Sequence, residues 1–259
     1  MEKISPKICV IGVGNVGSHL ALALSEIGWV CQILCRHKEH AVDVCASLPK
    51  CEVIDNPADL VADADYYIIA VNDDRVAEVI NSTPNYSGIW AHTSGSVPMT
   101  VFEGKKSHYG VFYPLQTFTR GVEVCMEEVP FLIEGNGDDV TESLLCLARK
   151  VSHTVERADS SRRKTMHLAA VFACNFANLM WLEADEILHR EGLSVKFLIP
   201  LLKATLGKLN DISPADAMTG PARRGDHAVI QSHLEMLEGE RRAEYEMLSN
   251  RILKKFADK

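Results

Sequence analysis

The chain has 259 residues, of which 47% are hydrophobic and 24% are charged, and its 35 Asp and Glu against 27 Lys and Arg give a formal net charge of −8. This is an ordinary globular composition, which excludes a disordered chain and a collagen-like repeat. The acidic balance argues against a nucleic acid or an anionic membrane as a partner, because both attract a surplus of Lys and Arg.

The sequence predicts a cytoplasmic protein without a membrane helix. Its longest uncharged apolar stretch, residues 168–182, is shorter than the ~18–20 residues that cross a bilayer. Glycines interrupt the apolar N-terminal segment, and no signal-peptide cleavage pattern follows it. The eight Cys include no Cys-x-x-Cys pair, so we expect reduced thiols and no metal site.

Short apolar runs alternate with helical patterns in the first part of the chain, which is typical of a parallel sheet covered by helices on both faces. The predicted strands are residues 8–11, 30–34, 66–71, 89–91, 109–112 and 131–133. Gly28 is expected to end the first helix in a left-handed conformation. We therefore expect an α/β fold, a Rossmann doubly wound and mostly parallel sheet, over residues 1–157.

From residue 160 onward almost all of the sequence has helical periodicity. Ser213-Pro214 and Gly225-Asp226 are predicted helix starts because of their capping residues and the proline. We expect an all-helical domain over residues 158–259, with a long helix over 160–190 and further helices over 197–209, 214–218, 227–237 and 241–256.

The first predicted strand leads into Gly12-Val13-Gly14-Asn15-Val16-Gly17 and then directly into a helix. In this context the first glycine permits a tight turn, the second lets a pyrophosphate approach the backbone, and the third lets helix and strand pack closely. The pattern predicts a dinucleotide-binding loop. A turn with a structural role alone is the alternative.

The residues after the second predicted strand favour NADP(H) over NAD(H). An NAD site normally has Asp or Glu there, whereas this chain has Arg36 and His37, followed by Lys38. These cationic groups would hold the 2′-phosphate that distinguishes NADP. A surface arginine without this role is the alternative.

Two further loops are expected at the carboxyl edge of the sheet, where the cofactor binds. One begins at Val71-Asn72, and the other is His92-Thr93-Ser94-Gly95-Ser96. We expect Val71, Asn72, Thr93 and Ser94 to contact the cofactor and His92 and Ser96 to face a substrate. The alternative is that Ser94 or Ser96 only caps a helix.

On the long predicted helix, four polar side chains share one stripe because successive residues advance by ~100°. They are Lys164, His167, Asn175 and Asn178. Such groups within an apolar helix need partners, which a cleft toward the first domain would supply. The alternative is that they bond to neighbouring helices within the core.

Residues 219–226 combine a Gly-Pro turn, two arginines and a helix start. Arg224 could hold a substrate carboxylate beside Thr219, while Asp226 caps the helix or orients Arg224. An internal salt bridge is the alternative.

These motifs together resemble a family of bacterial predicted NADP oxidoreductases that joins a Rossmann-like domain to a helical domain of unknown function. The resemblance rests on the glycine loop, His92-Thr93-Ser94-Gly95-Ser96, Pro114-Leu115-Gln116-Thr117-Phe118, His167-x-Ala169-Ala170-Val171-Phe172 with Asn175-Phe176, and Thr219-Gly220-Pro221 with Arg224-Gly225-Asp226. The layout is more distantly similar to deazaflavin-dependent NADP oxidoreductases, pyrroline-5-carboxylate reductase, ketopantoate reductase and 6-phosphogluconate or β-hydroxyacid dehydrogenases.

The resemblance implies a substrate between the nicotinamide and the long helix, a helical domain like that of 6-phosphogluconate dehydrogenase, and a homodimer formed through this domain. Two positions depart from the pattern. The β-hydroxyacid branch has a Lys one turn before the helix Asn, where this chain has Val171, and relatives often have a His before Pro-Leu, where this chain has Tyr113.

We therefore expect an NADP(H)-dependent oxidoreductase that transfers hydride between the nicotinamide and a small carbonyl or imine bearing a carboxylate, in the interdomain cleft. The expected roles are proton donation by His167 or Lys164, orientation of the substrate by Asn175, and substrate contacts from His92, Ser96, Gln116, Thr219 and Arg224. The alternative is an NADP(H)-binding sensor or scaffold that performs no hydride transfer.

Overall fold

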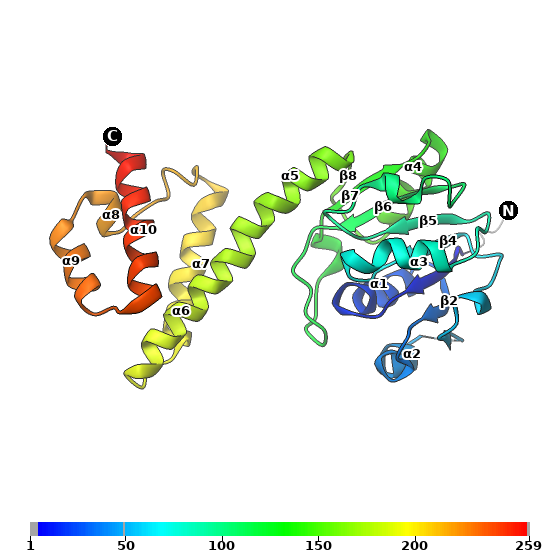
Figure 1. Ribbon diagram of the computed structural model, residues 1–259, viewed down its shortest axis with the longest axis horizontal. Coiled ribbons are helices and arrows are strands. Elements are labelled where there is room, and N and C mark those ends of the chain that lie inside the picture. Colours follow the sequence, from blue (N-terminus) through cyan, green and yellow to red (C-terminus); the bar gives the residue numbers. More distant parts are fainter. Residues whose placement is uncertain (1–4, 49, 258–259) are drawn as a thin grey trace. The chain divides into compact units, whose positions relative to one another are not determined.

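The structure is a computed structural model that describes residues 5–48 and 50–257 (Figure 1). The chain forms two compact units that divide between Cys174 and Asn175. This division lies inside one long helix, which belongs partly to each unit. The boundary that we expected between residues 157 and 158 stays a prediction.

Within the described residues, the first unit contains one eight-stranded sheet in the order β3-β2-β1-β4-β5-β6-β7-β8. All neighbours run parallel except β6 and β7, which run antiparallel. The predicted α/β, doubly wound, mostly parallel sheet is therefore confirmed. The strands are β1 (Lys7–Ile11), β2 (Trp29–Leu34), β3 (Glu52–Ile54), β4 (Tyr66–Ile69), β5 (Ile89–His92), β6 (Tyr109–Pro114), β7 (Phe131–Gly135) and β8 (Val155–Arg157).

Helices cover both faces of this sheet, so each central strand is buried on two sides. On β1, Ile8 and Val10 belong to one apolar cluster, while Cys9 and Ile11 belong to another. The first cluster includes side chains of α1 (Asn15–Ser25), α2 (Val42–Ala46) and α4 (Asp138–Ala148), and the second includes side chains of α3 (Val76–Ser82).

Gly28 does not have the left-handed conformation that we expected, because it is absent from the glycines with positive φ. A Cβ at this position would lie 2.7 Å from the carbonyl oxygen of Pro6. The chain therefore has glycine here because β1 and the start of β2 approach closely, and not because the helix end needs an unusual φ.

The long helix is confirmed as a continuous element from Ser160 to Arg190, made of α5 (Ser160–Ala170), a π-helical segment (Val171–Phe176) and α6 (Ala177–Arg190). A π-helix has i→i+5 hydrogen bonds and turns less per residue than an α-helix. The stripe that we derived from uniform α-helical geometry is therefore wrong beyond residue 171, because Asn175 and Asn178 are displaced around the helix axis.

By length and composition alone, this helix is able to cross a membrane, in contrast to our expectation from the uncharged stretch. Its most apolar 18-residue window has a mean hydropathy of 1.3, and none of that window is buried within the chain. A single helix of this kind is weak support for a membrane span, because helices that other protein surfaces cover have the same length and composition.

The second unit is all-helical, as expected. After α6 it contains α7 (Ile199–Gly207), α8 (Pro221–Arg224), α9 (His227–Glu235) and α10 (Gly239–Phe256). The predicted start of α9 is confirmed, because the Asp226 carboxylate accepts a hydrogen bond from the Val229 amide at 3.2 Å. The likeness of this unit to 6-phosphogluconate dehydrogenase stays a prediction.

The helix that we predicted over residues 214–218 is wrong, because this segment is a turn. The hydroxyl of Ser213 accepts a hydrogen bond from the Asp216 amide at 3.2 Å and donates one to the Asp216 carboxylate at 2.6 Å. Side chains that bond to the backbone in this way compete with helix formation.

Candidate functional site

The glycine loop after β1 has the geometry of a phosphate-binding turn. Gly12 has a φ of 96°, and a Cβ on it would lie 2.5 Å from the Ala70 carbonyl oxygen. A Cβ on Gly17 would lie 2.0 Å from the Gly12 carbonyl oxygen, which shows how closely α1 packs against the turn. A Cβ on Gly14, by contrast, would have no atom within 4 Å, so the Gly14 backbone is open to a ligand at the start of α1.

A cavity of about 540 Å³ lies at the carboxyl ends of β1, β2 and β4, where the strand order reverses. It brings together residues from three loops that the sequence predicted to meet. The predicted cofactor residues that line it are Gly12, Gly14, Arg36, His37, Val71 and Asn72. Val13, Asn15, Val16 and Gly17 belong to the same glycine loop or to the start of α1.

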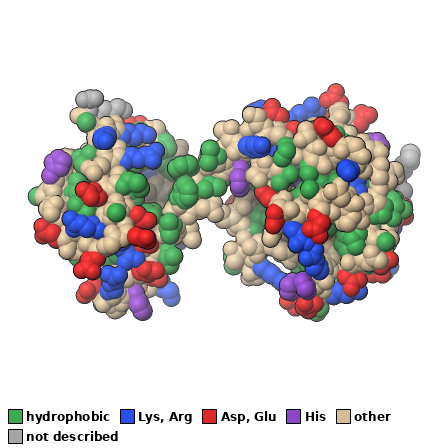
Figure 2. Space-filling model, in the orientation of Figure 1, with side chains coloured by type: hydrophobic (Ala, Val, Ile, Leu, Met, Phe, Trp, Pro, Cys, Tyr) green, Lys and Arg blue, Asp and Glu red, His purple; other side chains and the backbone are tan. Residues whose placement is uncertain are grey.

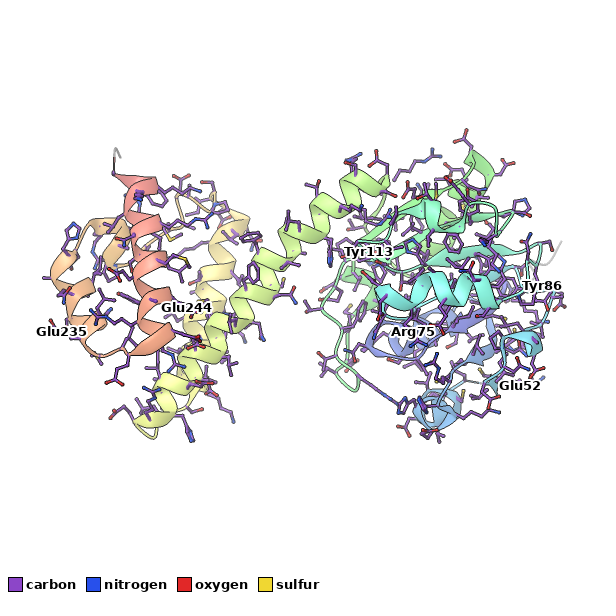
Figure 3. All side chains as sticks on the ribbon, viewed as in Figure 1. Glu52, Arg75, Tyr86, Tyr113, Glu235 and Glu244 are labelled. Carbon is purple, nitrogen blue, oxygen red and sulfur yellow. The ribbon has the colours of Figure 1, made fainter. Side chains whose placement is uncertain are left out.

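Two charged residues that line this cavity, Arg75 and Glu78, were not predicted from the sequence. Arg75 lies just before α3 (Figure 3). Its guanidinium contacts the Glu78 carboxylate at 2.7 and 2.9 Å. Arg36 contacts the same carboxylate at 3.2 Å. The Asn72-Asp73-Asp74-Arg75 segment was the available signal, because it follows β4 and begins the helix at the edge of the cavity.

The loop after β5 is held by its own hydroxyl groups. Thr93 donates its hydroxyl to the Ile69 carbonyl at 3.3 Å, and Ser94 Oγ accepts from the amides of Ser96 and Val97 at 3.1 and 3.0 Å. Ser96 donates a short hydrogen bond to the Asp73 carboxylate. Thr93 and Ser94 are nearly buried, so they shape the loop and expose little surface to a ligand.

His92 lies inside the protein. Its side chain is fully buried, its ring stacks on Phe102, and its Nδ1 accepts a hydrogen bond from the Ser94 amide at 3.2 Å. Burial lowers the pKa of His92 to about 3, and the positive charge of Arg163 acts in the same direction. In this structure His92 therefore has no surface with which to contact a substrate.

Tyr113 and His167 form a hydrogen-bonded pair above this loop. The Tyr113 hydroxyl lies 3.1 Å from Nδ1 of His167, although the two residues are 54 positions apart. A Cβ on Gly95 would lie 2.7 Å from Cζ of Tyr113 and 2.9 Å from Cγ of His167, so glycine is needed beneath both rings. An imidazole therefore adjoins the position where Tyr113 departs from the family pattern, and it comes from α5.

The environment of this pair favours the protonated phenol. Tyr113 lies at the end of β6 and is only 8% exposed (Figure 3). Burial raises the pKa of Tyr113, the carboxylate of Asp73 adds to this effect, and Arg163 opposes it. Near neutral pH the Tyr113 hydroxyl therefore keeps its proton.

Arg163 fixes the position of α5 on the sheet. It is fully buried, its Nη1 contacts the Glu134 carboxylate at 2.5 Å, and its Nη2 donates to the Val97 carbonyl at 2.7 Å. The neighbouring Lys164 is exposed and does not share this environment. The anchored helix holds His167 against the loop after β5.

The remaining predicted residues take no part in the contacts described above. Gln116 is exposed after β6, and its side-chain Oε1 accepts a hydrogen bond from the Thr117 amide at 2.8 Å. Asn175, Thr219 and Arg224 belong to the helical unit, where all three side chains are exposed. Their roles stay proposals.

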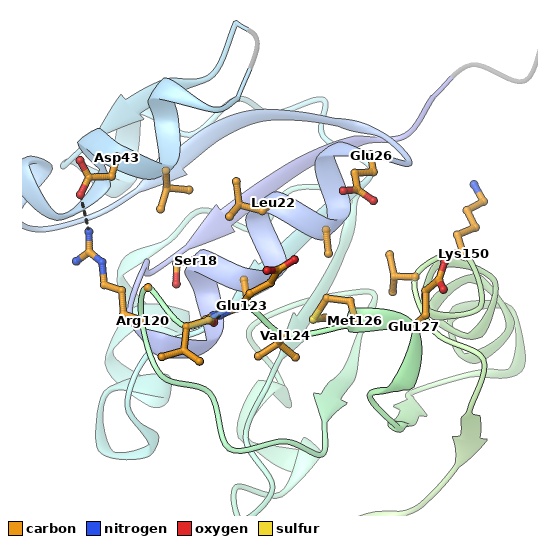
Figure 4. Close-up of a pocket in the computed structure, with 16 residues that line it drawn as sticks. Ser18, Leu22, Glu26, Asp43, Arg120, Glu123, Val124, Met126, Glu127 and Lys150 are labelled. Atoms are coloured by element: carbon orange, nitrogen blue, oxygen red, sulfur yellow. Dashed lines mark hydrogen bonds and ion pairs between the residues drawn. The ribbon is translucent and has the colours of Figure 1, made fainter. Parts of the chain in front are cut away.

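A second cavity of about 710 Å³ runs along α1 (Figure 4). Leu22, Val124 and Met126 contribute apolar surface, and Arg120 lies 3.8 Å from Asp43 at one end. This cavity is separate from the glycine loop, and none of the predicted site residues lines it.

Comparisons with known proteins agree with this geometry. Residues 7–91 match the family described as NADP oxidoreductase coenzyme F420-dependent, and residues 129–252 match the domain of unknown function DUF2520. A candidate NADP oxidoreductase from Bacteroides fragilis is 36% identical over 96% of this chain and 98% of its own, with a TM-score of 0.89. No curated protein matches the chain.

Two more distant structures share the fold. A reductive aminase from Aspergillus terreus, in complex with NADPH and ethyl-5-oxohexanoate, is 14% identical over 97% of this chain and 94% of its own, with a TM-score of 0.71. A 1-pyrroline-5-carboxylate reductase from Streptococcus pyogenes is 15% identical over 96% and 97%, with a TM-score of 0.67. The chain itself belongs to the family of NADP oxidoreductases that joins an F420-dependent-type NADP oxidoreductase domain to a DUF2520 domain.

Proposed function

We propose that this oxidoreductase uses NADP(H) to reduce a C=N or C=O bond of a small substrate, with Tyr113 and His167 as its proton source. The observation that carries the proposal is the hydrogen bond between Tyr113 and His167, whose rings both pack on Gly95 in the loop after β5. NADPH, when bound, supplies the hydride. The protein then has to bind the cofactor, orient the substrate and deliver one proton.

The cofactor assignment rests on the cavity beside the glycine loop. The open backbone at Gly14 and the start of α1 suit a pyrophosphate, and Arg36 and His37 suit a 2′-phosphate. Asn72 lines the same cavity, and Thr93 shapes the neighbouring loop. The reductive aminase complex with NADPH supports this choice, because it has the same fold.

The proton step uses groups that the chain places together. As a C–H bond forms, the electron pair of the C=N or C=O bond moves to nitrogen or oxygen, which takes the proton of the Tyr113 hydroxyl. His167 then returns a proton from Nδ1 to the phenolate across the 3.1 Å hydrogen bond, while its Nε2 takes up a proton from water. His167 is favoured over Lys164 as the second group because only His167 contacts Tyr113 in this way.

The proposed substrate class follows from the family resemblance. Imine reductases share this fold, and the Streptococcus pyogenes protein with this fold is a 1-pyrroline-5-carboxylate reductase. Arg224, exposed at the end of α8, would pair with a substrate carboxylate.

The test is NADPH oxidation by the purified protein with a panel of cyclic imines and keto acids, with and without a carboxylate. Tyr113→Phe should lower kcat by about 10²–10⁴-fold, the usual contribution of a general acid. Its Kd for NADPH should stay unchanged. Tyr109→Phe, which removes a hydroxyl from the other end of the same strand, is the matched control.

Two results would contradict the proposal. Full turnover by Tyr113→Phe would remove this residue as the proton donor. Tight NADPH binding without turnover of any substrate in the panel would favour the other reading of the sequence, an NADP(H)-binding sensor or scaffold.

We also propose that the protein is a cytoplasmic homodimer formed through the helical unit. Large apolar side chains are exposed along α6 and α7, which is unusual for a monomer (Figure 2). They include Leu179, Trp181, Leu182, Ile187, Leu201 and Leu206, with Phe197 just before α7. A second copy of the chain would cover them.

A further inference from the structure

One carboxylate lies between two arginines in the cofactor cavity. Glu78, on α3, contacts Arg75 at 2.7 and 2.9 Å and Arg36 at 3.2 Å. Arg36 comes from the end of β2 and Arg75 from the start of the α3 segment, so the contact joins two loops of the site. All three residues line the cavity that also contains Gly12 and Gly14.

These contacts are weak enough for a ligand to replace. The side chains of Arg36, Arg75 and Glu78 are 63%, 37% and 56% exposed, so water screens their attraction. A phosphate monoester has a charge of about −1.5 to −2 and three strong acceptor oxygens. Two planar guanidinium groups bind such an anion more strongly than they bind one exposed carboxylate.

We propose that Arg75 is the second cation that binds the 2′-phosphate of NADP(H), together with Arg36, and that Glu78 competes with that phosphate. In the empty site Glu78 holds the two guanidinium groups together. When the phosphate binds, it takes the place of the carboxylate, whose charge then opposes binding. The inference rests on the proposed NADP(H) site and adds the residues that set its affinity.

The probes are 2′,5′-ADP and 5′-AMP, which differ only in the 2′-phosphate and carry no nicotinamide. Their Kd values are measured by calorimetry for the wild type, Glu78→Gln and Arg75→Gln. We expect Glu78→Gln to bind 2′,5′-ADP about fivefold more tightly or better, and Arg75→Gln to bind it about tenfold more weakly. Both variants should bind 5′-AMP as the wild type does.

The double variant Arg75→Gln/Glu78→Gln separates two explanations of the Arg75 effect. In the single variant Arg75→Gln, Glu78 loses a partner and repels the phosphate more strongly. If Arg75 itself binds the phosphate, the double variant still binds 2′,5′-ADP more weakly than Glu78→Gln alone. Glu142→Gln removes an exposed carboxylate of an ion pair that does not line the cavity, and should change neither Kd.

Three outcomes would overturn the inference. Unchanged or weaker binding of 2′,5′-ADP by Glu78→Gln contradicts competition by the carboxylate. An equal loss for both nucleotides in Arg75→Gln places this arginine at another part of the ligand. Wild-type protein that binds neither nucleotide removes the proposed cofactor site itself, and this failure is distinct from a wild type that binds both with no effect at Arg75.

Discussion

At the residue scale, Gly95 determines whether Tyr113 and His167 can share one position above the loop. Gly95→Ala would add a Cβ at 2.7 Å from the tyrosine ring and 2.9 Å from the imidazole, so at least one ring must move. A displacement of about 1 Å in a reacting group can lower a rate about 10²-fold. We expect a loss of this size in kcat with the proposed substrates.

The control for Gly95→Ala is Gly137→Ala. Gly137 has a φ of −165°, and a Cβ there would meet nothing within 4 Å. NADPH affinity, measured by nicotinamide fluorescence, should change in neither variant. A Gly95→Ala enzyme with wild-type kcat would show that the pair is not part of the reaction.

His92 makes the free energy of unfolding depend on pH. Its pKa is about 3 in the folded state, whereas an unfolded histidine has a pKa of about 6.5. Between these values the unfolded chain binds one more proton, so the free energy of unfolding rises with pH. This contribution is fully present above about pH 6.5 and is lost as the pH falls toward 3.

Urea unfolding at a series of pH values tests this sign. His92→Asn keeps an acceptor for the Ser94 amide and removes the titration, so the pH slope between 4 and 6.5 should be shallower than in the wild type. His153→Asn, which replaces an exposed histidine of the same unit, is the control for removing an imidazole outside the core. Equal slopes for wild type and His92→Asn would show that His92 is not buried as a neutral group.

At the element scale, the sequence predicted β1, the glycine loop and α1 because three signals agree there: an apolar strand, spaced glycines and a helical pattern. β3 and β8 were not predicted, since each has three residues, lies at a sheet edge and includes an exposed Glu. The π-helical segment has no comparable signal, because its apolar residues continue those of α5 without a break.

The attachment of α5 to the sheet depends on one buried ion pair. Arg163→Met would leave the Glu134 carboxylate, which is 15% exposed, without its cation. Removing one partner of a buried pair costs about 3–5 kcal/mol, whereas replacing both partners with apolar side chains costs much less. We therefore expect Arg163→Met to lower the free energy of unfolding by this amount and Arg163→Met/Glu134→Met to recover most of it.

Arg157→Met is the matched control, because it breaks an exposed ion pair with Glu142 on the same unit. Its effect on stability should be small. A double variant as unstable as Arg163→Met would mean that the hydrogen bonds from Arg163 to Val97 and Ser160 hold the helix, and not the charge pair.

In the molecule as a whole, the cofactor cavity could be predicted because the topology of a parallel sheet determines where its loops meet. Carboxyl ends of parallel strands meet at one edge, so Gly12, Arg36 and Asn72 could be placed together from the chain alone. The pairing of Tyr113 with His167 could not, because it depends on how α5 packs on β6, which no local pattern encodes. Arg75 was missed because a charged residue at a helix start has an ordinary role in most proteins.

The exposed apolar surface of the helical unit leads to a prediction about assembly. Phe197 and Leu201 are 76% and 63% exposed, so burying them against a second copy would remove large apolar areas from water. Light scattering after size exclusion should give the mass of a dimer for the wild type and of a monomer for Phe197→Glu/Leu201→Glu. Met236→Glu is the control, because Met236 is 74% exposed and follows α9, so it belongs to neither α6 nor α7.

The same variants distinguish a protein partner from a membrane, since the helix from Ser160 to Arg190 is long enough for either. If another copy covers the surface, the wild type is a dimer that does not float with liposomes. This dimer dissociates in the Phe197→Glu/Leu201→Glu variant and stays intact in Met236→Glu. A wild-type monomer that floats with liposomes would show that lipid covers the apolar side chains. A bilayer would have to accommodate the charged Glu183, Asp185 and Glu186 of α6, two of which pair with Arg241. We therefore expect the first result.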